Sequence, residues 1–377
     1  MRVYADNAAT TAISKKALDA MLTGYQKGFG NPSSLHKRGQ EASKILLKAR
    51  EQIAECIKAS PKEIYFTGSG SESDNQAIFT AARIGAQQGK KHIITSEIEH
   101  HAVLNVMHKL ENEGFEITYL PVEKNGRIHP SLIQENITDE TCLVSVMMVN
   151  NETGVIQPVK EIGKICKQSK ILFHTDAVQA VGHVSIDMSL LPIDFLSFSA
   201  HKFHGPKGVG VLYCRIPTEP ETIIFGGGQE RGKRAGTENT PAISAMGVAF
   251  QEALDQIEEK NEYMRSLKMT LINELSSIPG FFINGAVDQS TANILNIGFE
   301  HIDNEMLLLL LDGKGIEVSA GSACTSGSLD PSHVLLAMGL SESRAKNSIR
   351  ISLSYENTME EIVYMTDSIK EIVQNLR

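Results

Sequence analysis

Three segments of this chain place reactive or anion-binding residues directly after short apolar runs. They are residues 67–72 (TGSGSE), 174–179 (HTDAVQ) and 197–208 (SFSAHKFHGPKG). In open α/β sheets, ligands bind beyond the carboxyl ends of the strands, where loops and helix N-termini meet. The three segments are therefore candidates for one binding site.

Each segment also has an ordinary interpretation when it is taken alone. Gly70 and Ser71 could hold a phosphate at a helix N-terminus, because glycine admits close backbone approach, but Gly/Ser turns after strands are common. Asp176 ends an apolar run, where a lone acid most often caps a helix. Lys202, beside His201, is a candidate nucleophilic amine, although most lysines are solvated surface charges.

Taken together, the three segments predict a more specific chemistry. A phosphate cradle, a carboxylate and a lysine at successive strand ends are what pyridoxal 5'-phosphate requires. That cofactor needs a phosphate anchor, an acid that keeps its pyridine nitrogen protonated, and a lysine that forms a Schiff base. The sequence therefore predicts a pyridoxal-phosphate site.

Alternating strand-like and helix-like segments predict the fold that positions these residues. Helical patterns cover residues 71–88, where Ser71 and Asp74 have the spacing of a capping motif, and then residues 103–110 and 159–168. Short strands alternating with helices indicate an α/β fold with a mainly parallel, doubly wound sheet. The expected strands are residues 63–67, 92–96, 115–122, 142–149, 171–175 and 195–199.

A second pattern begins at Thr240. Thr240 and Pro241, a cap followed by proline, predict one helix that runs to about residue 278 and bridges two domains. Beyond it, the strand candidates FFING, NILNIGF and SIRISLS alternate with helical segments, which is typical of a smaller α+β domain. We expect a large domain over residues 15–258 and a small domain over residues 1–14 and 259–377.

Composition restricts the classes of function. The 377 residues are 41% hydrophobic and 21% charged, the mix of a soluble globular chain. The net charge is −9 and the pI is near 5.8, whereas nucleic-acid-binding proteins usually carry an excess of basic residues. The longest apolar run, residues 306–311, is too short to span a bilayer. We expect no direct nucleic-acid or membrane partner.

The cysteines separate into four ordinary ones and one distinctive one. They are odd in number, scattered and without C-x-x-C spacing, so we expect no disulfide framework, no metal site, and a cytoplasmic location. Cys324 lies in a Ser/Gly-rich stretch (SAGSACTSGS, residues 319–328) that is typical of a functional loop, with an incidental thiol as the alternative. The four in helix-like or strand-like surroundings are Cys56, Cys142, Cys166 and Cys214.

The order of motifs along nearly the whole chain resembles the cysteine desulfurases, which are fold-type I pyridoxal-phosphate enzymes of the class V aminotransferase family. Besides the three segments above, the resemblance rests on YADNAATT, FGNPSS, GSESDN, EIEHHAV, VNNETGV, GGGQERGKRAGTEN and SAGSACTSGS, in this order. The last of these is similar to the longer-loop group (group I) of desulfurases. The resemblance implies the fold-type I architecture, a large domain with a doubly wound sheet plus a small α+β domain.

The resemblance also implies roles around the cofactor. Lys202 would form the Schiff base, Asp176 would hold the pyridine nitrogen, and Gln179 would donate to the phenolic oxygen. His100 would stack on the ring and act as an acid or base. The phosphate contacts would be Gly70, Ser71, Ser199, His201 and, from the second subunit of a homodimer, Thr237.

For the substrate, the resemblance implies that L-cysteine is bound through its carboxylate. Arg350 would receive that carboxylate, since a guanidinium fork binds it bidentately, and Asn151 would lie near it and the cofactor. Cys324 would attack the substrate sulfur, giving L-alanine and a Cys324 persulfide, with His100 as the base that helps ionise the thiol.

Two other functions stay open at this point. A selenocysteine lyase or an aminotransferase could use the same scaffold, although transamination needs no thiol. A sulfur-carrier scaffold without cofactor would not need Lys202, Asp176, His100 and Arg350 together. The sulfur acceptor is expected to be an iron–sulfur scaffold or a tRNA-thiolating enzyme, and the sequence does not choose between them.

Overall fold

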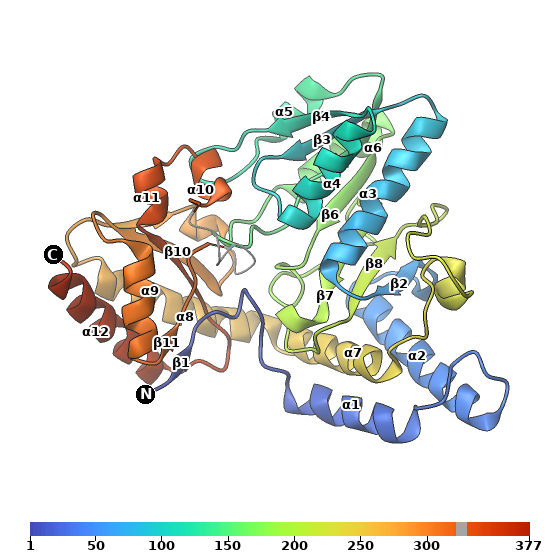
Figure 1. The fold of residues 1–377 in the computed structure, drawn as a ribbon, viewed down its shortest axis with the longest axis horizontal. Helices are drawn as coiled ribbons and strands as arrows, with labels where there is room; N and C mark the ends of the chain where they lie inside the picture. Colours follow the sequence, from blue (N-terminus) through green and yellow to red (C-terminus); the bar gives the residue numbers. More distant parts are fainter. Residues whose placement is uncertain (322–329) are drawn as a thin grey trace.

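A seven-stranded mixed sheet forms the centre of the larger part of the protein. The structure is a computed structural model that describes residues 1–321 and 330–377 (Figure 1). The strand order is β2 (Ile64–Thr67), β8 (Gly210–Cys214), β7 (Phe195–Ser199), β6 (Leu172–Asp176), β5 (Thr141–Ser145), β3 (His92–Ser96) and β4 (Glu116–Leu120). From β7 to β4 all neighbours are parallel, whereas β8 runs antiparallel to both β7 and β2. The predicted α/β class with a mainly parallel sheet is confirmed.

Helices cover both faces of this sheet because successive strand residues point to opposite sides. Ile93 joins the core cluster under α3 (Gly70–Gln87) and α4 (His101–Asn112), while Ile94 joins the cluster on the other face. That second face is covered by α2 (Lys37–Cys56), α5 (Pro130–Asn136), α6 (Val159–Ser169) and α7 (Thr240–Leu254), with α1 (Lys15–Lys27) packed outside α7. Burial on both faces explains why the strands read as continuous apolar runs.

The smaller part is built on a three-stranded antiparallel sheet with its own hydrophobic core. β10 (Ile294–Phe299) lies between β12 (Ser348–Ser352) and β9 (Phe281–Asn284), and β1 (Val3–Tyr4) pairs with β11 (Ile316–Glu317). The N-terminus therefore lies beside the C-terminal part of the chain (Figure 1). Helices α8 (Ile257–Leu275), α9 (Asn304–Gly313) and α12 (Met359–Asn375) pack on this core.

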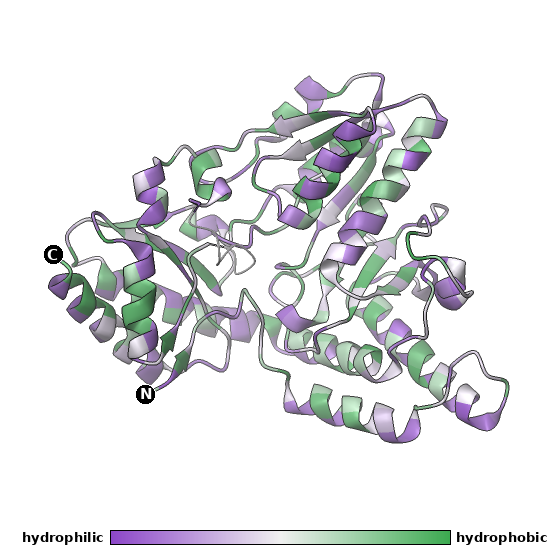
Figure 2. Cartoon of the chain, in the orientation of Figure 1, coloured by the Kyte–Doolittle hydropathy of each residue, from purple (hydrophilic) through white to green (hydrophobic). Residues whose placement is uncertain are grey.

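Hydropathy follows this layering. The strands of both sheets carry mostly hydrophobic residues, whereas the surrounding helices carry hydrophobic and hydrophilic residues on different sides (Figure 2). Within the described part of the chain, no helix combines the length and hydropathy needed to cross a bilayer. The domain boundaries at residues 14/15 and 258/259 stay predictions.

Two sequence-based expectations about helices are wrong. The single helix from Thr240 to about residue 278 is two helices, because Asp255 is extended and Gln256 adopts left-handed dihedrals (φ 54°) before α8 begins. The helix after the first strand is capped by Ser69, whose hydroxyl accepts from the Glu72 amide at 3.1 Å, and not by Ser71. Local spacing identified the helix but misplaced its cap by two residues.

Candidate active site

One cavity of about 170 Å³ lies beyond the carboxyl ends of β6 and β7. Its walls come from the N-terminal segment, the start of α3, the start of α4, the ends of β6 and β7, and β12. Ten of the residues expected from the sequence line it: Gly70, Ser71, His100, Asn151, Asp176, Gln179, Ser199, His201, Lys202 and Arg350. Thr237 is exposed and does not line this cavity, and Cys324 lies outside the described residues.

Lys202 stands in a short 3-10 turn, Ala200–Lys202, that follows β7 directly. The turn is tight because Gly205 approaches Ala200 closely; a Cβ at position 205 would lie 2.8 Å from the Ala200 carbonyl oxygen. The Lys202 ammonium donates to the carbonyl oxygens of Ala8 (2.5 Å) and Ala9 (2.8 Å). The N-terminal segment therefore holds the amine near the carboxyl end of β7.

Asp176 is the last residue of β6 and is almost fully buried. One carboxylate oxygen accepts from the Val178 amide at 2.8 Å. Burial, and then the neighbouring Asp74, raise the pKa of Asp176 to about 8. Burial likewise raises the pKa of Asp74 to about 7. This part of the cavity therefore favours a cation, since a positive charge would allow a buried acid to ionise.

The start of α3 forms a cradle for an anion. The first helical residue, Gly70, cannot be replaced without movement, because a Cβ there would lie 2.6 Å from the Val178 side chain. Ser71 is exposed in the same turn, and Ser199 and His201 line the cavity beside it. The unpaired amides of a long helix's first turn bind phosphate well.

His100 caps α4 and presents one ring nitrogen to its own helix. Its Nδ1 accepts from the Ala102 amide at 3.1 Å. Burial, followed by the charge of Lys202, lowers the pKa of His100 to about 4, so the ring is neutral at neutral pH. In a neutral ring whose Nδ1 accepts, the proton is on Nε2. In this arrangement Nε2–H can donate a hydrogen bond into the cavity, and the expected role of His100 as an acid or base stays a prediction.

Arg350, in the middle of β12, is 1% exposed and carries its charge into the cavity wall. Nη2 pairs with the Asp6 carboxylate at 2.8 Å, and Nη1 donates to the Asn151 carbonyl oxygen at 2.9 Å. Nε is buried and has no hydrogen-bond partner among the residues that the structure describes. Asp6 had no role assigned from the sequence, although it lies in the YADNAATT motif.

Gln179 makes a contact that the sequence analysis did not predict. Its side-chain amide donates to the Ala8 carbonyl oxygen at 2.8 Å, the same oxygen that accepts from Lys202. The N-terminal segment therefore holds two cavity residues together. These contacts could not be predicted from the sequence, because a backbone carbonyl's contacts depend on the path of the chain in space and not on the type of side chain.

The four described cysteines lie away from this chemistry. Cys142, Cys166 and Cys214 are buried, Cys56 is half-buried, and none of them lines the cavity. Burial raises the pKa of Cys142 to about 11 and the pKa of each of the other three to about 12. These thiols stay protonated at neutral pH and are therefore weak nucleophiles.

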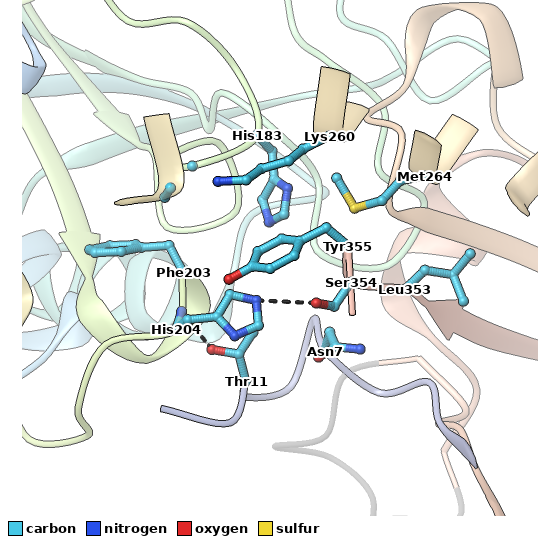
Figure 3. Close-up of a pocket in the computed structure, with 12 residues that line it drawn as sticks. Asn7, Thr11, His183, Phe203, His204, Lys260, Met264, Leu353, Ser354 and Tyr355 are labelled. Atoms are coloured by element: carbon cyan, nitrogen blue, oxygen red, sulfur yellow. Dashed lines mark hydrogen bonds between the residues drawn. The ribbon is translucent and has the colours of Figure 1, made fainter. Parts of the chain in front are cut away.

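A second cavity lies on the other side of the Lys202 turn, between the two parts of the protein (Figure 3). There the His204 ring interacts with the Ser354 hydroxyl at 3.2 Å and lies beside the Tyr355 ring. Its volume is about 20 Å³, which suits about one water molecule and excludes an amino acid. Among the described residues, no group of three or more His, Cys, Asp or Glu side chains is placed to hold a metal ion.

The donor set of the larger cavity fits pyridoxal phosphate. The cofactor's three polar ends require an anion cradle, a buried acid and a lysine amine, and Gly70, Asp176 and Lys202 supply them from three different strand ends.

Comparison with known proteins agrees with this geometry. Residues 3–365 match the model of the aminotransferase class-V family. The chain is 49% identical to cysteine desulfurase IscS of Methanosarcina thermophila over 100% of this chain and 93% of that protein. It is 44% identical to putative cysteine desulfurase IscS 1 of Bacillus subtilis, covering 100% and 99% of the two chains.

Solved structures give the same result. A NifS-like protein superposes with a TM-score of 0.94 at 40% identity, covering 100% of both chains. A structure described as SspA in complex with cysteine superposes with a TM-score of 0.83 at 37% identity, over 94% of this chain and 100% of the other. The chain belongs to the class-V aminotransferase family, whose members are pyridoxal-phosphate enzymes, and has their fold-type I architecture.

The pKa of Asp176 predicts how the cofactor-free protein responds to pH. Its pKa of about 8 in the folded protein lies above the ordinary aspartate value of 3.8, so the folded protein binds this proton more tightly and loses stability as the pH rises from about 3.8 to about 8. Asp176→Asn should therefore stabilise the cofactor-free protein at pH 8 by at least about 1 kcal/mol, and less at pH 5. Urea unfolding at both values measures this. The exposed Asp139→Asn is the control, and an equal effect of Asp176→Asn at both pH values would contradict the assignment.

Proposed function

We propose that this protein is a pyridoxal-phosphate-dependent cysteine desulfurase. It would convert L-cysteine to L-alanine and leave the sulfur as a persulfide on Cys324. The observation that carries the proposal is the convergence of Lys202, Asp176, Gly70 and Arg350 on one cavity in a chain of this family. The full-length similarity to proteins named cysteine desulfurase supports the choice of substrate.

The cofactor would be held by the residues that the cavity presents. Lys202 would form the Schiff base, and Asp176 would ion-pair with the protonated ring nitrogen, a positive charge that would lower the raised pKa of this buried acid. His100 would lie against the ring, and Gln179 and Asn151 near its oxygen. The phosphate contacts would be Gly70, Ser71, Ser199, His201 and the partner subunit's Thr237. When bound, the cofactor supplies an electron sink for the bonds at the substrate's Cα and Cβ.

The chain's own residues would then bind the substrate and move its protons. Arg350 would receive the carboxylate of L-cysteine, using the guanidinium face that Asp6 and Asn151 leave open. Lys202, once its amine is released by the substrate, would take the Cα proton. His100 would hold the substrate through a hydrogen bond from Nε2–H and, as the resemblance implies, would act as the acid or base near the bound cofactor.

Sulfur transfer would be completed by Cys324, whose thiolate attacks the sulfur of the bound cysteine. The C–S bond of the substrate breaks and an S–S bond forms, so L-cysteine and a thiol become L-alanine and a persulfide with no external oxidant. The electron pair of the broken bond stays on the former Cβ, which is then protonated. This balance requires a reactive thiol, a feature that a plain aminotransferase does not need.

Several finer features belong to the same proposal. The protein would act as a homodimer in the cytoplasm, with a large domain over residues 15–258 and a small domain over residues 1–14 and 259–377. Its persulfide would pass to an acceptor protein, either an iron–sulfur scaffold, as the name IscS of its relatives suggests, or a tRNA-thiolating enzyme. Selenocysteine, which differs from cysteine only in the atom transferred, is the second candidate substrate.

Replacing Lys202 tests the cofactor assignment. Lys202→Ala should lose the visible absorbance of the bound cofactor and at least about 10³-fold of the activity, because the Schiff base and the Cα base are lost together. Absorbance spectra and alanine formation measure both. Lys207→Ala, an exposed lysine in the same segment, is the control. A lysine adduct that borohydride still traps in Lys202→Ala would show that another residue has this role.

Mixed dimers test the shared site that Thr237 implies. A heterodimer of one Thr237→Ala subunit and one Lys202→Ala subunit should contain one site with both lesions and one intact site. Activity should therefore rise above that of either parent homodimer after the subunits are mixed and exchanged. Activity no higher than that of the parents would contradict a site built from two subunits.

Replacing Cys324 tests the reaction itself. Cys324→Ser should keep its cofactor and still change its visible spectrum with L-cysteine, because those steps need only Lys202, Asp176, His100 and Arg350. Alanine formation should fall by at least about 10²-fold, since a hydroxyl is a far weaker nucleophile than a thiolate. Mass spectrometry should find one extra sulfur on the Cys324 peptide of the wild-type protein. Sulfur on another cysteine, or full turnover by Cys324→Ser, would reject the proposed function.

A further inference from the structure

Glu152 is a buried carboxylate beside the active site that the mechanism above does not use. It follows Asn151 in the turn after β5 and is 1% exposed. Its backbone amide donates to the Asn150 side chain at 3.0 Å, and its carbonyl oxygen accepts from Asn296 of β10 at 3.2 Å. The backbone of Glu152 is therefore fixed between the large sheet and the small sheet.

The Glu152 carboxylate binds the chain shortly after residue 330, through Ser332. The Ser332 hydroxyl donates to Oε2 at 2.5 Å and also accepts from the Leu335 amide at 3.2 Å, as the cap of α10 (His333–Ala337). Leu335 packs in a small apolar cluster with Ile98 and Met147 of the large part. Through Ser332, Glu152 thus fixes a helix that packs in the same apolar cluster as Met147, a residue of the cavity wall.

The same carboxylate lies against the chain before residues 322–329. Gly321 has left-handed dihedrals (φ +77°), and a Cβ at this position would lie 3.1 Å from Oε2 of Glu152. Two residues earlier, Ser319 pairs through its backbone with Arg350, whose amide donates to the Ser319 carbonyl oxygen at 2.6 Å. Gly321 and Ser332, on the two sides of the segment, therefore both lie beside the Glu152 carboxylate. This carboxylate is close to the residues that would bind substrate.

We propose that Glu152 is a positioning residue for sulfur transfer. It binds Ser332 and lies against Gly321, and so sets the positions, relative to Arg350, of the described residues on either side of the segment that carries Cys324. Cys324 follows Gly321 by three residues, a length of chain that reaches at most about 11 Å, so a shift of Gly321 changes what the thiol can reach. This inference rests on the proposed function.

The test separates sulfur transfer from the earlier steps. In single turnover with L-cysteine, Glu152→Ala and Ser332→Ala should each slow formation of the Cys324 persulfide by about 10-fold, the effect of losing one hydrogen bond to a charged group. Cofactor content, and the rate of the visible spectral change that L-cysteine causes, should stay within about two-fold of wild type, since neither depends on the flanks. Glu152→Gln, which keeps an acceptor of the same shape, should recover most of the loss.

Matched controls exclude a general effect on folding. Ser341→Ala removes the cap of the neighbouring helix α11 (Glu342–Lys346), where the hydroxyl accepts from the Arg344 amide and has no contact with Glu152. Glu97→Gln changes an exposed glutamate. Both controls should form persulfide at the wild-type rate. The double variant Glu152→Ala/Ser332→Ala should be no slower than the slower single variant by more than about two-fold, because both changes remove one interaction.

Three results would overturn the inference. These are wild-type persulfide formation in Glu152→Ala and Ser332→Ala, an equal slowing of the spectral change, or fully multiplicative losses in the double variant. If Glu152→Ala does not fold, the rates of persulfide formation in Ser332→Ala and in its control Ser341→Ala still test the inference. Absence of a Cys324 persulfide in the wild-type protein would reject the proposed function and this inference with it, whereas a wild-type persulfide with unaffected variants would reject this inference alone.

Discussion

The buried guanidinium of Arg350 is the interaction on which the site depends most. An unpaired charge would be too costly at 1% exposure, so the side chain requires acceptors, and it takes them from two distant segments. Asp6 comes from the N-terminal strand region and Asn151 from the turn after β5. The ion pair therefore ties the N-terminal segment to the small sheet, and the hydrogen bond to Asn151 ties both to the turn that follows β5. Because Asp6 is fixed in this position, the carbonyl oxygens of Ala8 and Ala9 lie within hydrogen-bond distance of the Lys202 amine. The buried charge of Arg350 therefore helps to position Lys202 as well.

Other buried titratable groups in the same region show that the site is arranged for a ligand at some cost to the folded chain. Asp74 and Asp176 are buried close to each other, and burial raises the pKa of both. Lys202 stands near His100 and His201, and burial followed by the lysine's charge lowers the pKa of each ring to about 4. In a stable core such groups would be replaced by apolar residues of similar size. Their presence around one cavity is typical of an active site. There the folded protein gives up stability to keep titratable groups that interact with a bound ligand.

Much of this arrangement follows from the sequence, because strand ends and helix starts are local features. The apolar runs before Asp176 and Lys202 gave the strands, and the sheet topology then brought their ends together, as expected for a doubly wound fold. What the sequence could not give depends on the path of the chain in space. The carbonyl of Ala8 serves both Lys202 and Gln179, and Asp6 pairs with a residue 344 positions away. The break at Gln256 was also missed, since a polar residue in left-handed conformation has no distinct signature.

The burial of the other cysteines explains how one thiol could act alone in a chain that has five. Sulfur transfer between thiols is fast only when the attacking group is ionised and accessible. Cys142, Cys166 and Cys214 are enclosed by the apolar clusters on the two faces of the large sheet, and Cys56 is packed against one of them. Burial holds all four pKa values near 11 or 12, so thiolate is scarce there at neutral pH. The same packing that stabilises the sheet therefore keeps these four thiols enclosed and protonated, which makes each of them a poor sulfur acceptor.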